Sequence, residues 1–224
     1  MRGPHTLQCE VCGGPTQFRA PRCGYCHAPL TWGATVEIVP GDEIARADMA
    51  RDTLPGWSPE ATAAARRGDA CAVEFKHAMV KLGTFATPAC DACISVSGVC
   101  LDDQGNLGAL ARYVREGAAQ SYYGAWIHPG RRRFTLERVL GTPQSAEIEV
   151  LTEWEVSGHV APVGALNRVE LRCADSVLDL LVNGERVATV VDARFGFGHF
   201  GWRASSVTPP STLLVHSVEL RHIR

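Results

Sequence analysis

The stretch from Leu166 to Ala204 constrains the fold more than any other part of the chain. Two runs of alternating apolar residues, Val169-Leu171-Cys173 and Leu178-Leu180-Val182, lie on either side of a short turn. Asn183-Gly184 then supplies the dipeptide with positive φ that a tight hairpin requires, and a third strand is predicted over Val187 to Val191. Three consecutive strands joined by tight turns are typical of an antiparallel β-sandwich, which holds its own core without a cofactor.

The rest of the C-terminal part repeats this spacing of strand and turn. Runs rich in β-branched and aromatic residues are separated by Gly, Pro, Asn and Asp, which is the pattern of an all-β domain. Further strands are predicted at Cys71–Lys81, Cys93–Leu101, Leu107–Arg115, Gln120–His128, Arg132–Leu140, Ala146–Val156 and Leu213–Ile223. The sequence therefore predicts an antiparallel β-sandwich over residues 69–224.

Four cysteines near the N-terminus form two CxxC pairs, Cys9 with Cys12 and Cys23 with Cys26. Each pair can place two thiolates around a tight turn, and four thiolates complete a tetrahedron around Zn²⁺. Because no ligand position remains for water, the predicted site is structural and not catalytic. The alternatives are four unrelated cysteines or a redox pair. The pattern resembles the zinc-ribbon family over residues 7–32, which implies a small module, here residues 1–34, that depends on its metal for folding.

Charge and composition limit the classes of partner. A formal net charge of −2 gives no broad attraction to nucleic acid or to an anionic membrane. No apolar run approaches the length of a membrane span, and the N-terminus lacks the apolar core of a secretory signal. Nine cysteines in such a chain indicate metal binding or buried thiols. We therefore expect a cytosolic protein that binds neither membrane nor nucleic acid.

Residues 35–68 are predicted to be a linker between the two parts. The segment begins with a short strand at Val36 to Val39 and then mixes Ala, Arg, Asp, Glu, Pro and Gly. Short helices are expected at Ile44 to Asp52 and at Pro59 to Arg67, the second with Ser58 as its N-cap.

The C-terminal part resembles a known family through residues that recur in order along residues 66–224. These are Gly108 to Arg112, Tyr122-Tyr123, Gly130, Phe134-x-Leu136-x-Arg138, Trp154, Asn167, Asn183-Gly184, Asp192, Gly198 and Gly201. They resemble the concanavalin A-like lectin/glucanase jelly roll, and among its members the laminin-G-like and glycosidase-associated sandwich domains. The resemblance implies two curved antiparallel sheets with a ligand site on the concave face or on the rim loops. Members of the family bind sugars, hydrolyse glycosides or contact proteins, so the fold does not fix the function.

Aromatic and basic residues supply one candidate ligand site. Tyr122 and Trp126 share one face of a predicted strand, with Tyr123 on the other face, and Arg112 lies on the preceding strand. Sugars stack on such rings while a guanidinium fixes their hydroxyl groups. The alternative is that these side chains are packed in the core. If the domain binds a small ligand, we expect Arg112, Tyr122 and Trp126 to contact it.

An acidic strand supplies the second candidate. Strand alternation places Glu147, Glu149, Glu153 and Glu155 on one face, and two carboxylates two residues apart lie about 5 Å apart, as a retaining glycosidase requires. In the glucanase branch of the family a Glu-x-Asp-x-Glu strand performs this chemistry, but here Glu149 replaces the Asp and the third acid comes late. The alternative is a solvated acidic face that pairs with Arg168 and Arg172.

These observations favour a non-catalytic recognition or scaffold protein. A zinc ribbon with structural Zn²⁺ would be tethered to a β-sandwich that binds a protein partner or a glycan-like ligand. A protein partner is the preferred hypothesis, because most polysaccharides lie outside the cell. The alternative function is a glycoside hydrolase that uses Glu147 and Glu149, and a third hypothesis is a subunit of a larger assembly.

Overall fold

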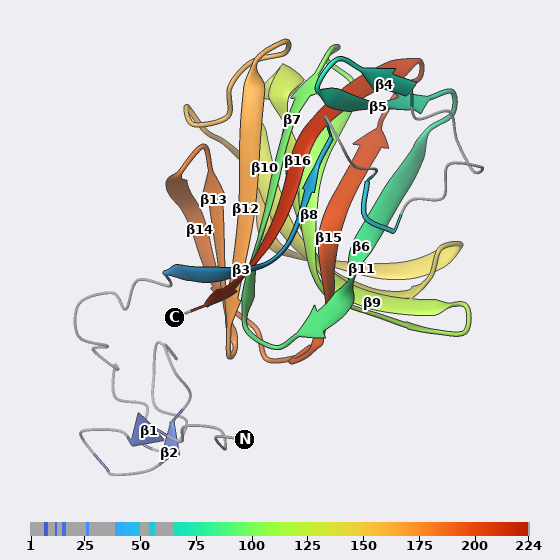
Figure 1. Cartoon of the computed structure of the whole chain (residues 1–224). Helices are drawn as coiled ribbons and strands as arrows, with labels where there is room; N and C mark the ends of the chain where they lie inside the picture. Colours follow the sequence, from blue (N-terminus) through green and yellow to red (C-terminus); the bar gives the residue numbers. More distant parts are fainter. Residues whose placement is uncertain are drawn as a thin grey trace.

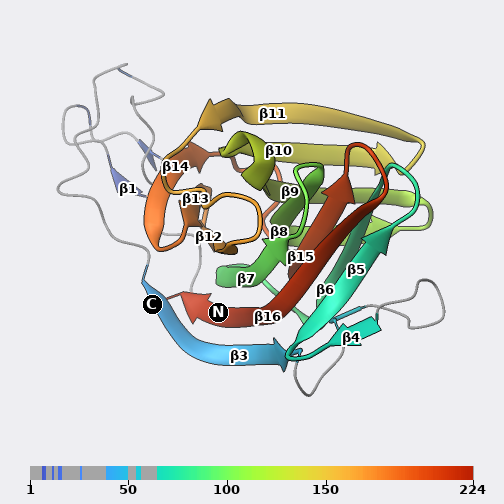
Figure 2. The same ribbon diagram turned by 90° about the horizontal axis from the view of Figure 1, so that it is seen from above.

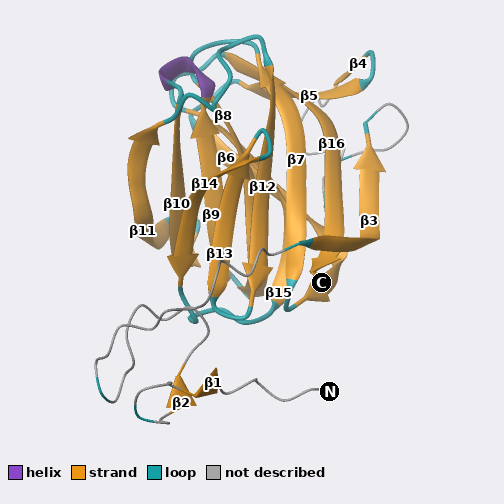
Figure 3. Cartoon of the chain, turned by 90° about the vertical axis from the view of Figure 1, so that its left-hand side faces the viewer, coloured by secondary structure: helices purple, strands orange, loops and turns teal. Residues whose placement is uncertain are grey.

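The computed structural model of the chain describes residues 7–8, 12, 15–16, 26, 39–49, 54–56 and 65–223. Its body is a sandwich of two antiparallel sheets (Figure 1). Within the described residues, the only helical element is a single 3₁₀ turn, η1 (Pro129–Arg131), and all other elements are strands (Figure 3). The predicted all-β sandwich is confirmed. Across the described part of the chain, no helix has the length and apolar character that crossing a membrane requires.

One sheet of the sandwich has six strands. Their order is β11 (Ser145–Val156), β10 (Arg133–Thr142), β9 (Ala119–His128), β8 (Gly105–Glu116), β15 (Gly198–Ser206) and β6 (Met79–Ala89). Strands β8 to β11 follow each other in sequence and form a meander, whereas β15 and β6 are brought in from distant parts of the chain.

The second sheet has eight strands. Seven lie in the order β14 (Glu185–Val191), β13 (Val177–Val182), β12 (Leu166–Ala174), β7 (Ala92–Cys100), β16 (Ser211–Ile223), β5 (Ala70–Phe75) and β4 (Ala65–Arg67). The eighth, β3 (Pro40–Asp48), pairs with the second half of β16 and runs along its outer side (Figure 2). A separate two-stranded sheet joins β1 (Leu7–Gln8) to β2 (Pro15–Thr16).

Apolar side chains from the inner faces of both sheets fill the space between them. Trp202 and Phe200 of β15 and Tyr123 of β9 come from the six-stranded sheet, and Ile94 of β7 and Leu171 of β12 come from the eight-stranded sheet. All five are fully buried. Because strand side chains alternate between faces, every second residue of these strands is left to an outer face.

The hairpins around Asn183-Gly184 form as predicted. Asn183 and Gly184 have φ values of 54° and 89° and join β13 to β14, while Asp175 at 49° lies in the turn from β12 to β13. The Asn183 amide also accepts a hydrogen bond from the Arg168 backbone N–H at 2.8 Å and donates to the carbonyl of His159 at 2.8 Å. The turn is therefore fixed by its own side chain as well as by its backbone.

Two sequence predictions are wrong in the same way: helices were expected where the chain forms strands, because these strands depend on partners that the local sequence does not show. The helix expected at Ile44 to Asp52 is strand at residues 44–48, where β3 finds the free edge of β16. The helix expected at Pro59 to Arg67 is strand at Ala65–Arg67, and its earlier residues lie outside the described ones, as do most of Val36 to Val39.

The single strand expected at Cys71 to Lys81 is divided between the two sheets. Bends at residues 76–78 separate β5 in the eight-stranded sheet from β6 in the six-stranded sheet. Part of the predicted linker also contributes to the core, since Met49 and Leu54 are buried there and the Trp202 indole N–H donates to the Pro55 carbonyl at 3.0 Å.

The inward and outward positions of β12 can be tested with two substitutions of the same type. We expect Leu171→Ala, at a fully buried position, to lower the free energy of unfolding by about 2–5 kcal/mol. Leu166→Ala on the same strand, at a side chain that is 57% exposed, should change it by less than about 0.5 kcal/mol. Urea unfolding of the two variants measures both values, and equal losses would contradict the register of β12.

Candidate functional site

A groove of about 740 Å³ lies on the outer face of the six-stranded sheet. Every strand of that sheet contributes to it, so the groove crosses the sheet from the β6 edge to the β11 edge. The residues that line it are Gly56, Met79, Val80, Lys81, Leu82, Tyr113, Arg115, Ala118, Gln120, Tyr122, Glu137, Val139, Pro143, Ala146, Ile148 and Arg203.

Apolar side chains form one part of the groove floor. Leu110, Tyr122 and Val139 make a small buried cluster of their own, separate from the core between the sheets, and Tyr113 packs against it. The rings of Tyr113 and Tyr122 lie 5.9 Å apart and are tilted by 38°. Burial raises the pKa of the Tyr122 phenol above its usual value. This hydroxyl therefore stays protonated and can donate a hydrogen bond.

A buried arginine forms the other part of the floor. Arg203 is only 2% exposed, and its guanidinium lies over the ring of Trp126, with Cζ 3.7 Å from the ring centroid. Its Nη2 donates to Glu137 Oε1 at 2.7 Å, and the Trp126 indole N–H donates to the same oxygen at 3.1 Å. A buried charge needs such partners, and here one carboxylate and one aromatic face supply them.

Two glycines leave the space that the Arg203 side chain occupies: Gly108, its partner on β8, and Gly124 on β9, the next strand. A Cβ on Gly124 would lie 1.4 Å from Arg203 Nη1, and a Cβ on Gly108 would lie 2.8 Å from Arg203 Cγ. The sequence places Gly124 midway between Tyr122 and Trp126 on the same face of β9. The missing side chain thus lets Arg203 lie flat across the sheet.

The two edges of the groove expose apolar side chains. Met79 and Val80 on β6 are 44% and 52% exposed, and Ile148 on β11 is 56% exposed. The polar lining residues include Gln120 and Arg115, which supply an amide and a guanidinium. The groove thus combines an apolar wall, two tyrosine rings and a few hydrogen-bonding groups, which is the usual make-up of a site for a small organic ligand.

The three residues predicted to contact a ligand do not lie together. Tyr122 lines the groove, and Trp126 lies in the floor under Arg203. Arg112, which is 1% exposed, lies elsewhere and binds the chain itself. It donates to the carbonyls of Cys90 at 3.0 Å and Phe195 at 2.8 Å and pairs with Asp91 at 3.3 Å. Its positive φ of 54° marks the register shift in β8.

Sequence reasoning missed Arg203 and Glu137. Their signal was present, since Phe200, Trp202 and Ala204 occupy the inner face of β15 and leave Arg203 on the outer face. What the sequence does not show is that β10 and β15, which are separated by β9 and β8 in the sheet, bring a carboxylate and a guanidinium into contact over Gly124.

The acidic strand does not face the groove. Glu149 pairs with Arg138, which also binds Asp192, while Ile148 between Glu147 and Glu149 is the side chain that lines the groove. The expected pairing of these glutamates with Arg168 and Arg172 is wrong, because β11 and β12 belong to different sheets. Arg168 and Arg172 instead bind Glu170 on their own strand.

The predicted zinc ligands fall largely outside the described residues. Cys9 and Cys23 are not described, whereas Cys12 and Cys26 are, and both are exposed. The pairing of β1 with β2 brings residues 7–8 and 15–16 side by side, on either side of the first CxxC pair. Among the described residues alone, no group of three or more His, Cys, Asp or Glu side chains is placed to bind a metal.

Comparison with known proteins bears on the fold. Neither a model of a known protein family nor a curated protein sequence matches the chain. Solved structures do match. A Bacillus subtilis protein of unknown function with a galectin-like fold superposes with a TM-score of 0.63 at 8% identity, covering 84% of this chain and 99% of that one.

Two further solved structures also superpose on the chain. The carbohydrate-binding module CBM66 from Bacillus subtilis has a TM-score of 0.52 at 12% identity and covers 69% of this chain and 86% of its own. The κ-carrageenase from Pseudoalteromonas carrageenovora, solved with a κ-carrageenan oligotetrasaccharide, has a TM-score of 0.51 at 8% identity, covering 78% and 88%. At these identities the likeness establishes a jelly-roll sandwich and nothing about the ligand.

The fit between Gly124 and Arg203 can be tested directly. We expect Gly124→Ala to displace the guanidinium and to lower the free energy of unfolding by about 1–3 kcal/mol. Gly158→Ala is the matched control, because a Cβ there meets nothing within 4 Å, and it should change stability by less than about 0.5 kcal/mol. Thermal and urea unfolding provide the comparison. A neutral Gly124→Ala would contradict the position of Arg203 in the floor.

Proposed function

We propose that the protein is a non-catalytic recognition protein whose β-sandwich binds a glycan in the groove of the six-stranded sheet. The observation that carries this proposal is the combination of the Tyr113 and Tyr122 rings with buried polar groups in one open groove. The fold supports it, since one protein of similar structure is a carbohydrate-binding module.

The chemistry of the groove suits a sugar. A pyranose ring has apolar C–H faces, which pack on aromatic rings, and an equatorial belt of hydroxyl groups, which need donors and acceptors. Tyr113, which is partly exposed, supplies a ring face, and the ring of Tyr122, only 4% exposed, packs against it. Gln120, Arg115 and the Glu137 carboxylate supply polar partners along the same surface. A floor that is held rigid by the ion pair of Arg203 and Glu137 loses little conformational entropy when a ligand binds.

The carboxylates favour binding over hydrolysis. A glycosidase of this kind uses two carboxylates that flank the scissile bond. Among the described residues that line the groove, Glu137 is the only acid, and it is bound to Arg203 and Trp126. Glu147 and Glu149, the pair in the alternative hypothesis, lie outside the groove lining.

A glycan also suits this groove better than a protein partner. Arg203 and Glu137 place polar groups in the floor, where the thin ring of a sugar can reach them, whereas the exposed apolar residues Met79, Val80 and Ile148 lie at the two edges. Met79, Val80 and Ile148 are nevertheless the residues that a protein partner would contact, and the substitutions below separate the two ligands.

The N-terminal part of the proposal is a structural zinc ribbon over residues 1–34. Cys9, Cys12, Cys23 and Cys26 would hold the ion, and four thiolates leave it no position for substrate or water. The pairing of β1 with β2 on either side of the first CxxC pair fits such a module. We also propose a cytosolic location, because the cytosol keeps cysteines reduced and the reduced thiolate is the form that binds zinc.

Glycan binding can be tested on an array of defined oligosaccharides, followed by calorimetry with the tightest ligand. We expect Tyr113→Ala to weaken that affinity by at least about tenfold, since truncating a central aromatic contact typically costs this much. Phe197→Ala, which removes a 53% exposed ring outside the groove, should leave it unchanged. Unchanged glycan affinity in Tyr113→Ala would contradict the proposal. So would a protein ligand whose binding is lost in Met79→Ser and Ile148→Ser but not in Tyr113→Ala. Cleavage of the bound oligosaccharide would contradict its non-catalytic part.

Zinc content can be measured on the purified chain by mass spectrometry of the metal. We expect about one Zn²⁺ per chain, reduced by at least half in Cys12→Ser, because a site with one ligand removed loses most of its affinity. Cys90→Ser is the control, since this exposed cysteine belongs to the separate CxxC pair with Cys93. Zinc retained in Cys12→Ser but lost in Cys90→Ser would contradict the ribbon.

A further inference from the structure

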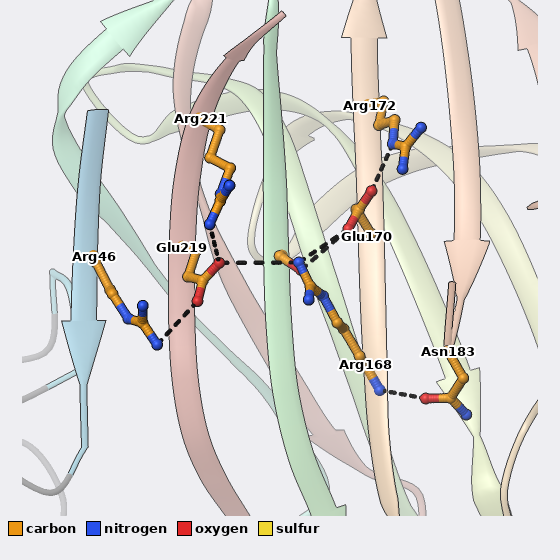
Figure 4. Close-up of polar contacts among 8 residues, drawn as sticks. Arg46, Arg168, Glu170, Arg172, Asn183, Glu219 and Arg221 are labelled. Atoms are coloured by element: carbon orange, nitrogen blue, oxygen red, sulfur yellow. Dashed lines mark hydrogen bonds and ion pairs between the residues drawn. The ribbon is translucent and has the colours of Figure 1, made fainter. Parts of the chain in front are cut away.

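The outer face of the eight-stranded sheet carries a set of arginines and glutamates that the proposed function does not use (Figure 4). Strand alternation places Arg168, Glu170 and Arg172 of β12 on this face, and Glu219 and Arg221 of β16 on the same face two strands away. Arg46 of β3 extends the set across the next strand, where it stands opposite Glu219.

The strand between β12 and β16 carries only small side chains on this face. Cys93, Ser95 and Ser97 of β7 lie opposite Arg172, Glu170 and Arg168 on one side and opposite Arg221, Glu219 and Ser217 on the other. Small residues between two rows of long ones leave a channel along β7. A cavity of about 530 Å³ opens there, lined by Pro40, Cys93, Arg168, Glu170, Arg172, Asn183, Gly184 and Arg221.

The cavity has an excess of positive charge. Three of its lining residues are arginines, Arg168, Arg172 and Arg221, and only one, Glu170, is an acid. Outside the lining, Glu219 lies between Arg46 at 3.2 Å and Arg221 at 3.4 Å, and Glu43 stands opposite Arg221 across the ladder. The buried carboxylate of Asp179, opposite Arg172, is bound by Thr189 at 2.6 Å and by Arg186 at 3.7 Å.

Contacts through the Nε atoms fix the direction of two of these guanidinium groups. Arg168 Nε donates to Ser95 Oγ at 2.6 Å, and Arg172 Nε donates to Glu170 Oε1 at 2.5 Å. Arg168 also reaches Glu170 at 3.2 Å and Glu219 at 3.9 Å through Nη2, and it remains 47% exposed. A guanidinium has five N–H donors in one plane. The contacts of Arg168 do not use all five, so it can bind a further acceptor.

Arg221 contributes a donor from the opposite side of the channel. Its Nη2 lies 3.4 Å from Glu219 Oε2, its Nε is buried without a hydrogen-bond partner, and its side chain is 37% exposed. Burial of the Cys93 thiol between these arginines raises its pKa, so the floor adds no thiolate charge near neutral pH.

We propose that this arginine pocket, formed by Arg168, Arg172 and Arg221, binds a tetrahedral oxyanion, either free or as the sulfate or phosphate group of a small ligand. Arginines from two strands line it, and the planar forks of their guanidinium groups match the oxygens of such a group. The pocket lies on the sheet opposite the groove, so it is a second site and does not depend on the proposed glycan binding. A nucleic acid would require a longer basic track than these residues provide, because its affinity grows with the number of phosphates contacted.

The test is a titration of the full chain with sodium sulfate and sodium phosphate, compared with sodium chloride at equal ionic strength. We expect saturable binding by calorimetry and saturable shifts of the amide resonances of residues 93–97. Arg168→Gln and Arg221→Gln should each weaken binding by at least about tenfold. Arg131→Gln, which removes an exposed arginine from η1, should bind as the wild type does.

Two further comparisons complete the test. Glucose 6-phosphate and glucose 6-sulfate that bind tighter than the inorganic ions would support a ligand-borne group, and equal affinities would support a free oxyanion. Tyr113→Ala should bind the anions unchanged, which keeps this result separate from the glycan proposal. Absence of saturation, equal weakening in Arg131→Gln, or much tighter binding of a single-stranded oligonucleotide would overturn the proposal. If a pocket variant fails to fold, the amide shifts of the wild type decide the outcome.

Discussion

The packing of two sheets through their inner faces is the constraint on which both proposed sites depend. In a strand, each residue given to the core is followed by one that faces outward. Trp202 and Arg203 show this on β15, and Tyr123 and Tyr122 show it on β9. The dry core holds the strands in one register, and that register determines which outward side chains meet. The chemistry of each outer face is therefore a consequence of core packing.

Arg203 shows how far this consequence reaches. Placing a guanidinium at 2% exposure is costly unless the charge is paired, and Glu137 and the face of Trp126 supply the pairing. The arrangement also requires that Gly124 carry no side chain. Solubility alone does not require the buried ion pair of Arg203 and Glu137, which is packed against Gly124 and Trp126. A rigid polar floor beneath an apolar groove is, however, what selective binding of a polar ligand requires.

Local patterns predicted the parts of the fold that depend on neighbours in sequence. The β12–β13–β14 hairpins follow from alternation and from Asn183-Gly184, whose positive φ values are a local property. The failures concern partners that are distant in sequence. Residues 44–48 have no strong strand pattern and become β3 because β16 offers them a free edge. The same distinction holds for the groove. Strand alternation predicted that Tyr122 and Trp126 share a face, whereas the contact of Arg203 with Glu137 depends on the order of strands in the sheet.

The two outer faces differ in a way that the strand sequences explain. On the six-stranded sheet, outward positions carry tyrosine, valine and glycine around one buried ion pair, so the surface is hollow and mostly apolar. On the eight-stranded sheet, β12 and β16 place arginine and glutamate at alternate positions while β7 keeps its outward residues small. An excess of guanidinium groups over carboxylates along such a channel attracts anions, and a ring-lined hollow attracts apolar faces. One sandwich thus presents two unlike surfaces on opposite faces. Because the core separates them, a small ligand with both a sugar ring and an anionic group can occupy only one of the two sites at a time.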